Sequence, residues 1–431
     1  MNTTTQTNRS FPLRDLEATK KKVLSWLRKF STFSFLDNHH YSLSHHSFEC
    51  LVAAGCKQFI KANAGIALEE LERFIKKKPG CWLFGHLGYD LKNETEDLTS
   101  RHPDHIGFPD LFFFEPEWVL QISPGLIMIE GEEPEKIFSE IESIHVMDPP
   151  DTSKPGIRNR ISKQDYISII HRLQQHILRG DCYEINFCQE FYDKDIIIDP
   201  VQVFKRLSSI SPNPFAALYK VYDQWLVCAS PERFLKKEGR KIFSQPIKGT
   251  ASRSELKGKD EVNRIRLAAS QKERSENVMV VDLVRNDLSR VCERGSVQVD
   301  ELFGIYSFPQ VHQMISTVSG LLKEEVSFSE IIRACFPMGS MTGAPKKRVM
   351  ELIEKYERTK RGIFSGAVGY ISPSGDFDLN VVIRSIMYNQ ATGYLSFQAG
   401  SGITFYSDPE QEWEECLLKA EAIRTVLNRH F

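Results

Sequence analysis

AGSGITFYSDPEQEWEE, residues 399–415, runs from the end of a predicted strand into the start of a predicted helix. Asp408 is a favourable N-cap and Pro409 suits the first helical position, so the phase of this helix can be read from the sequence. In that phase Glu412 and Glu415 share one face of the helix. The sequence therefore predicts two neighbouring carboxylates on the C-terminal helix, directly after a glycine-rich strand end.

Several residues around this stretch are candidates for contacting an anion. Gly400 and Gly402 let backbone amides approach a small anion closely, and Lys419 extends the acidic face of the helix. Arg384 in DLNVVIRSIMY interrupts an apolar strand pattern, which is costly unless its guanidinium meets a carboxylate. An anionic substrate would supply that carboxylate, and a structural salt bridge would do so equally well.

A second acidic pair lies in KERSENVMVVDLVRNDL, residues 272–288, where Glu273 and Glu276 project from one helical face. If both acidic pairs converge on one cleft, four carboxylates repel one another unless a hard cation lies among them. Oxygen-only ligands favour Mg²⁺ over zinc. The alternative is that each pair is a solvated helix surface, which is the usual place for glutamates at this spacing.

Two further residues are candidates for covalent and proton-transfer chemistry. Lys248 in QPIKGT follows an alternating strand and precedes a Gly-Thr turn, where a side chain can point into a cleft. Burial or a nearby cation is expected to lower the pKa of Lys248 and release the amine as a nucleophile. Glu232 in ASPERF is a candidate proton donor. An exposed lysine and an exposed glutamate at strand ends are the ordinary alternatives.

The rest of the chain predicts a mixture of helices and antiparallel strands. In CYEINFCQEFY, residues 182–192, period-2 alternation places Ile185 and Phe187 on one face and Glu184 and Cys188 on the other. Helices are expected over 13–30, 66–77, 162–180 and 257–291 and from 408 onward; strands are expected within 81–131, at 215–221 and 225–230, on both sides of a hairpin at 238–239, and near 363–388.

The prolines and polar residues of HVMDPPDTSKPGIRNR make it the best linker candidate. We accordingly expect a mobile tail over 1–12, an N-terminal part over 13–144, a linker over 145–160 and a catalytic region over 161–431. Ser162 and Asp165 resemble a capping box at the start of the helix that follows the linker, and Gly180 closes that helix.

Composition excludes several classes of protein. With 431 residues, 41% hydrophobic and 26% charged, the chain can bury a large core. A net charge of -2 gives no electrostatic basis for binding nucleic acid or an anionic membrane. Nine scattered cysteines without a C-x-x-C pair are typical of reduced thiols, and no apolar signal or spanning segment occurs. We expect a cytoplasmic protein.

Taken together, the motifs resemble the chorismate-utilising enzyme family, which includes anthranilate, aminodeoxychorismate, isochorismate and salicylate synthases. The resemblance covers most of the chain and is carried by FGHLGYDLKNETEDL, GDCYEINFCQEF, SPERF, PIKGT, ENVMVVDLVRNDLSRV, FPMGSMTGAPK, GIFSGAVGY and AGSGITFYSDPEQEWEE. It implies one large α/β (α+β) unit, with two stacked antiparallel sheets, helices outside, and an active site in the cleft between them.

The resemblance also implies roles for the candidate residues. The expected Mg²⁺ ligands, which bind the ring carboxylate of chorismate through the metal, are Glu273, Glu276, Glu412 and Glu415. The positions expected to contact the substrate directly are Thr250, Arg384, Gly400, Gly402 and Lys419. The positions expected to take part in catalysis are Lys248, Glu232 and Glu184.

Lys248 distinguishes the branches of the family. PIKGT resembles the aminodeoxychorismate branch, in which this lysine is a covalent nucleophile, whereas anthranilate synthases typically read PIAGT. Glu184 stands where the isochorismate and salicylate branches carry a lysine base. The resemblance thus implies amination of chorismate with Glu232 as general acid and with ammonia from a separate glutamine amidotransferase subunit. Anthranilate synthase is the alternative.

Two residues depart from the family pattern. Phe364 stands where many relatives have tyrosine, so any hydroxyl contact there is lost, and Glu184 replaces a common glutamine. The tryptophan-sensing L-L-E-S pattern is not apparent near the N-terminus, which argues mildly against the anthranilate alternative.

Overall fold

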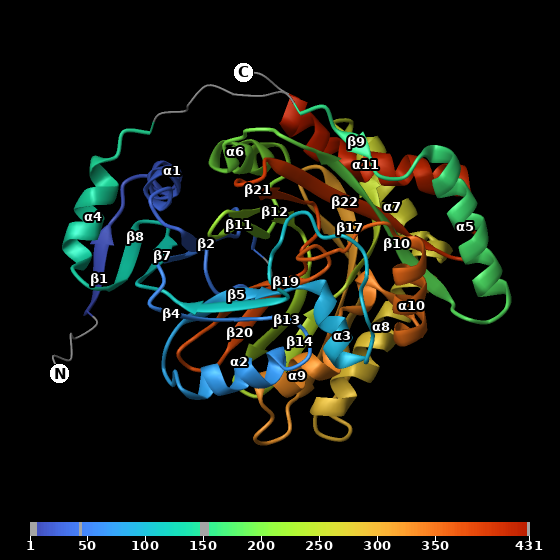
Figure 1. The fold of residues 1–431 in the computed structure, drawn as a ribbon, viewed down its shortest axis with the longest axis horizontal. Coiled ribbons are helices and arrows are strands. Elements are labelled where there is room, and N and C mark those ends of the chain that lie inside the picture. Colours follow the sequence, from blue (N-terminus) through green and yellow to red (C-terminus); the bar gives the residue numbers. More distant parts are fainter. Residues whose placement is uncertain (1–6, 43–44, 147–154, 429–431) are drawn as a thin grey trace.

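Two antiparallel sheets lie face to face in the computed structural model, which describes residues 7–42, 45–146 and 155–428 (Figure 1). Twelve of the described strands form the first sheet. Across it they run in the order β1 (Thr7–Pro12), β8 (Leu126–Gly131), β7 (Trp118–Ser123), β3 (Cys50–Ala54), β2 (Thr32–Asp37), β11 (Phe215–Val221), β12 (Gln224–Ser230), β21 (Ser385–Asn389), β22 (Tyr394–Ile403), β10 (Glu184–Asp193) and β18 (Gly343–Ala344), with β9 (Arg158–Asn159) paired to β10.

Ten described strands form the second sheet. Their order is β15 (Ile247–Ser252), β17 (Val311–Leu321), β14 (Lys241–Gln245), β13 (Arg233–Glu238), β20 (Phe377–Asn380), β19 (Ala367–Ile371), β5 (Leu83–Leu87), β6 (Leu111–Glu115) and β4 (Gln58–Ala62), with β16 (Gln298–Ser307) paired to β17. Both sheets therefore combine strands from the two ends of the chain. The two-sheet architecture expected from the resemblance is confirmed.

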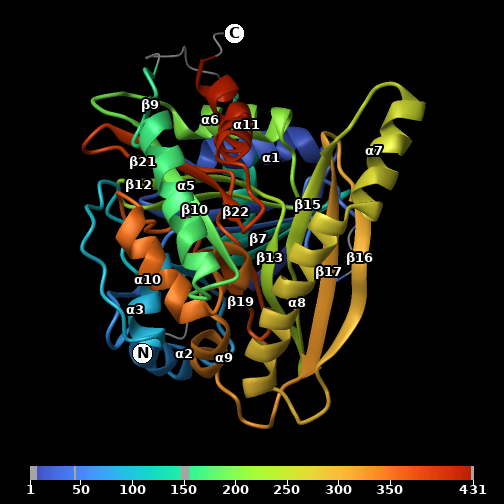
Figure 2. The same ribbon diagram turned by 90° about the vertical axis from the view of Figure 1, so that its right-hand side faces the viewer.

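Helices cover the outer sides of the sheets. Those that share a core with the first sheet are α1 (Leu16–Leu27), α4 (Pro134–Ser143), α5 (Lys163–Leu178), α6 (Pro200–Ile210), α10 (Lys346–Tyr356) and α11 (Pro409–Asn428). Those that pack on the second sheet are α2 (Ala67–Lys76), α7 (Lys257–Ala269), α8 (Gln271–Val291) and α9 (Phe328–Cys335). Figure 2 shows α7 and α8 running along β15, β17 and β16. Short helical turns are η1 (Tyr89–Leu91), α3 (Lys92–Thr95) and η2 (Gly339–Met341).

Strand β10 shows how alternation builds the two layers of the core. Ile185 and Phe187 belong to the cluster that packs under the helices of the first sheet. Cys188 belongs to the cluster that fills the space between the sheets. Because side chains alternate along a strand, Glu184 faces the same inner side as Cys188. The predicted alternation is thus confirmed, and it directs a carboxylate toward the interior.

Several predicted boundaries differ from the structure. Residues 7–12 of the expected mobile tail form β1, which pairs with β8. In the expected linker, Arg158–Asn159 forms β9, and residues 147–154 lie outside the described residues. The helix after the linker begins as expected, because the Ser162 side chain accepts a hydrogen bond from the backbone of Asp165. In the part of the chain that the structure describes, no helix is both long and apolar enough to cross a membrane.

Candidate active site

A buried ion pair joins the two sheets. Lys248 lies on β15 of the second sheet, and its Nζ donates a 2.5 Å hydrogen bond to Oε1 of Glu184 at the start of β10. The two side chains are only 11% and 3% exposed. Gly402 on β22 makes room for the pair, because a Cβ there would lie 2.5 Å from Glu184 Oε1 and 3.2 Å from Lys248 Nζ. A side chain at position 402 would collide with the carboxylate.

The expected lowering of the Lys248 pKa is wrong. Burial does disfavour the charged amine, but the nearby carboxylates, Glu184 first and then Glu276, outweigh it and raise the pKa of Lys248 above its ordinary value. The sequence showed that the lysine could be buried and did not show which side chain would be buried with it. The contact with Glu184 therefore favours the ammonium form of Lys248.

Glu232 lies between β12 and β13 and is 4% exposed. Ser340 Oγ donates a 2.7 Å hydrogen bond to Glu232 Oε1. Burial raises the pKa of Glu232 to about 7, against the opposing effects of Ser340, Lys248 and Arg384. A carboxyl group with this pKa holds a proton near neutrality and can release it, as a general acid must.

The sequence placed Arg384 inside a strand, and that prediction is wrong. Arg384 precedes β21 in a left-handed backbone conformation with φ of 51°, which cannot continue a regular ladder. Burial lowers the pKa of Arg384, and the charge of Glu232 opposes that effect. Among the described residues no side chain forms a hydrogen bond or ion pair with its guanidinium. A half-buried guanidinium without a protein partner can bind a carboxylate of a ligand.

Both predicted acidic pairs lie near a common cation, Lys272. Burial disfavours the charge on Lys272, but four carboxylates together raise its pKa above the ordinary value. They are Glu276 and Glu273 on α8 and Glu412 and Glu415 on α11. The helices α8 and α11 are far apart in sequence, so their convergence is a property of the tertiary structure. The solvated-surface alternative does not hold for Glu412, which is 3% exposed, or for Glu276, whose side chain is 13% exposed, whereas the side chain of Glu415 is 42% exposed.

Two of the four carboxylates, Glu276 and Glu412, lack partners that buried acidic groups usually have. Burial raises the pKa of Glu276 to about 7. Glu276 Oε1 and Glu412 Oε2 are buried and accept no hydrogen bond, which is costly for an ionised carboxylate. Lys272 Nζ lies 4.0 Å from Glu276 Oε1. Within the described ranges, no three His, Cys, Asp or Glu side chains are already spaced to hold a metal ion. The donors themselves are all oxygens, as a hard cation requires.

The other predicted substrate contacts lie at the edge of this region. Lys419 Nζ donates to the backbone oxygen of Gly400 at 3.0 Å and pairs with Glu415 at 2.7 Å. Thr250 is exposed on β15, two residues beyond Lys248. Phe364 is only 2% exposed, so it belongs to the core.

Sequence reasoning missed Lys272 and Ser340. For Lys272 a signal existed, because it precedes Glu276 by four residues on α8, the spacing of a helical ion pair. Ser340 lies in the quoted FPMGSMTGAPK motif, but nothing in that motif indicates a contact with Glu232, which is 108 positions away.

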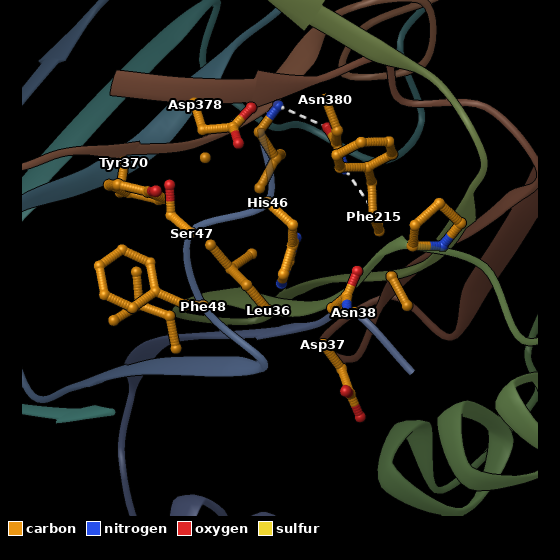
Figure 3. A pocket seen from close by; sticks show the side chains of 15 residues that line it. Leu36, Asp37, Asn38, His46, Ser47, Phe48, Phe215, Tyr370, Asp378 and Asn380 are labelled. Carbon is orange, nitrogen blue, oxygen red and sulfur yellow. Dashed lines mark hydrogen bonds between the residues drawn. The ribbon is translucent and has the colours of Figure 1, made fainter. Parts of the chain in front are cut away.

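A separate cavity lies between the sheets and contains none of the predicted site residues (Figure 3). Phe48 and Phe215 line it, and Tyr370 and Asp378 lie on strands of the second sheet. Asn380 Nδ2 donates to the Phe215 backbone oxygen at 3.0 Å across this region. The cavity is thus distinct from the group formed by Lys248, Glu184 and Glu232.

The sequence and the fold were compared with those of known proteins. The family model described as chorismate binding enzyme matches residues 32–425. An anthranilate synthase component I-like protein of Synechocystis is 34% identical, over 81% of this chain and 73% of that relative. The chloroplastic aminodeoxychorismate synthase of Arabidopsis thaliana is 36% identical over 78% of this chain, which spans only 39% of that longer relative. The crystal structure of anthranilate synthase component I from Streptococcus pneumoniae has a TM-score of 0.77 and 24% identity, covering 89% of this chain and 95% of that one.

Proposed function

The chain belongs to the family of chorismate binding enzymes, and from this premise we propose that it aminates chorismate at C4 to give 4-amino-4-deoxychorismate. The observation that carries the proposal is that Lys248 and Glu232 lie close enough for the charge of each to shift the pKa of the other. Lys248 supplies an amine that can attack carbon, and Glu232 supplies a carboxyl group with a pKa of about 7. Covalent substitution with loss of a hydroxyl group needs such a nucleophile and such an acid.

The proposed reaction has two halves that balance. In the first, the Lys248 amine forms a bond to C2, the ring double bond shifts, and the C4–O bond breaks while Glu232 gives its proton to the departing oxygen, which leaves as water. In the second, ammonia forms a bond to C4, the double bond returns, and the C2–N bond breaks to release Lys248. Glu232 recovers its proton from the new ammonium group, so chorismate and ammonia become product and water.

The anionic groups of the substrate need cationic partners. Arg384 is suited to a substrate carboxylate, because it is half-buried within reach of the charge of Glu232 and no described side chain pairs with it. Lys419 lies at the rim, 46% exposed, and points at the backbone of Gly400. These contacts would orient the ring so that C2 meets Lys248 and the C4 oxygen meets Glu232.

We propose Mg²⁺ as the cofactor, held by Glu273, Glu276, Glu412 and Glu415. When bound, such a metal fixes the ring carboxylate and withdraws electron density from the diene. The unpartnered oxygens of Glu276 and Glu412 support this assignment, since a divalent cation would satisfy them. In this structure Lys272 provides positive charge near the four carboxylates, and a bound metal ion would lie close to that ammonium group.

Mg²⁺ is expected to stabilise the protein against unfolding, because it binds the folded carboxylates. At a hundredfold excess over Kd the gain is about 2.7 kcal/mol. Thermal denaturation with and without Mg²⁺ measures it directly. The gain should disappear in Glu276→Gln and in Glu412→Gln and persist in Glu421→Gln, a matched change at an exposed position of α11. An equal gain in all four proteins would contradict the assignment.

The identity of the product shows which reaction the protein catalyses. Purified protein, chorismate, Mg²⁺ and ammonium should give a product that becomes 4-aminobenzoate only after aminodeoxychorismate lyase is added. We propose that a glutamine amidotransferase subunit supplies the ammonia, so glutamine should replace ammonium only in the presence of such a partner. Formation of 4-aminobenzoate should be followed by chromatography with and without the lyase.

Anthranilate synthase is the second candidate, and the Synechocystis relative favours it. That reaction also eliminates pyruvate and needs no lysine nucleophile. Fluorescence of anthranilate in the same assay without lyase would establish this candidate and refute amination at C4.

A further inference from the structure

The contact between Lys248 and Glu184 favours the protonated form of the amine. Its Nζ donates a 2.5 Å hydrogen bond to Glu184 Oε1, and the carboxylates around it stabilise its positive charge. A protonated amine has no free electron pair, so it cannot form a bond to carbon. Before the first half of the reaction, one proton must leave Lys248 for another group.

Five carboxyl groups face the Lys248 amine from four parts of the fold. They are Glu184 on β10, Glu232 beside β13, Glu273 and Glu276 on α8, and Glu415 on α11. Glu232 is unsuitable as acceptor, because its proposed role requires it to carry a proton at that moment. The three residues on the helices are proposed metal ligands, which must remain ionised. Glu184 is the remaining group.

Glu184 has the geometry of a proton acceptor. Its Oε1 already accepts the hydrogen bond from Lys248, and its Oε2 is buried without any partner. Transfer of the proton along this contact turns two buried charges into a neutral amine and a neutral acid. A site that a bound substrate has closed to water favours that exchange, because desolvation penalises both charged groups.

We propose that Glu184 is the general base that takes the Lys248 proton and so prepares the amine for attack on C2. The N–H bond of Lys248 breaks, its electron pair becomes available to carbon, and the proton resides on Glu184 until Lys248 is expelled and recovers it. This inference rests on the proposed function and adds a role for Glu184. Gly402 is part of the arrangement, since its missing side chain leaves room for the carboxylate.

Formation of the Lys248 adduct without ammonia tests the inference, because ammonia itself titrates in the relevant pH range. Rate constants for wild type and Glu184→Gln should be measured in single turnovers with chorismate and Mg²⁺ between pH 7 and 9. Adduct is identified by intact mass, as chorismate less water, and is mapped to Lys248 by peptide analysis. The ratio of the two rate constants cancels the titration of Glu232.

At pH 7 the Glu184→Gln rate constant should be lower by about 10²- to 10⁴-fold, the usual contribution of a general base. Relative to wild type it should rise roughly tenfold per pH unit, because the variant depends on the small free-amine fraction of a lysine with an ordinary pKa of about 10.4. Glu184→Asp, which keeps a carboxylate, should restore part of the rate and the wild-type pH profile. Gly402→Ala should behave like Glu184→Gln, since it displaces the carboxylate.

Two other outcomes overturn the inference and are distinct from failure of the proposed function. If Glu184 only orients Lys248, the ratio of rate constants will be the same at every pH. If Glu184 is dispensable, the variant will form adduct as fast as wild type. If wild type forms no adduct at Lys248, the proposed covalent amination itself is wrong. Comparison of thermal unfolding between the variants and wild type separates each of these results from misfolding.

Discussion

Lys248→Arg is expected to reduce the rate of chorismate amination by at least about 10³-fold, because it removes the nucleophile while keeping the positive charge beside Glu184. An arginine is protonated at every accessible pH, so it cannot supply a free amine. The product assay with ammonium and the intact mass of the protein after mixing with chorismate are the measurements. Neither product nor adduct should form at a significant rate.

Arginine is preferred here to alanine. Lys248→Ala would leave the Glu184 carboxylate buried without its partner, a change that destabilises proteins by several kcal/mol and would confuse loss of folding with loss of chemistry. Lys257→Arg on α7 is a matched control at an exposed position. Full amination by Lys248→Arg would refute the covalent route and favour direct attack by ammonia.

Glu232→Gln is expected to lower the amination rate by about 10²- to 10⁴-fold, the range for loss of a general acid. In the wild type the rate should fall above pH 7, because burial raises the pKa of Glu232 to about 7 and the acid is then lost. The variant should lack this decline. Single turnovers avoid the titration of ammonia. Ser340→Ala removes the hydrogen bond to Glu232 Oε1 and should cause a smaller loss, with the decline retained.

The same pKa shift predicts a pH dependence of stability. The pKa of Glu232 rises from an ordinary 4.5 to about 7 on folding, so the folded state binds the proton more tightly. Its contribution is complete below pH 4.5 and is lost as pH rises toward 7, by about 3 kcal/mol. Urea unfolding should be measured for both proteins at pH 5 and pH 8. The free energy of unfolding of Glu232→Gln, relative to that of wild type, should therefore be higher at pH 8 than at pH 5. An unchanged difference would mean that Glu232 is ionised freely in the folded protein.

Local signals were sufficient for many elements of the fold. Asp408 caps α11 as expected, with its side chain accepting from Gln411 at 2.9 Å. Ser162 caps α5, and alternation in β10 separates Phe187 from Cys188 correctly. These features depend on residues within about one helical turn or one strand of each other, so the sequence contains the whole cause.

Predictions that depended on distant neighbours were less successful. The Lys248 pKa was expected to fall and instead rises, because Glu184 is buried against it from 64 positions away. Arg384 was placed inside a strand, and its left-handed backbone was not foreseen. Lys272 was overlooked, although it lies in the field of all four predicted metal ligands.

By itself, the sequence determined the two-sheet family fold, the phases of its helices and the set of acidic and basic residues available for chemistry. Only the tertiary structure decided which of those charges meet, since β10, β15, α8 and α11 come together through long-range strand pairing and helix packing. The reason is physical: a side chain's propensity acts over a few residues, whereas its charge state depends on every group buried within a few ångströms, wherever in the chain that group originates.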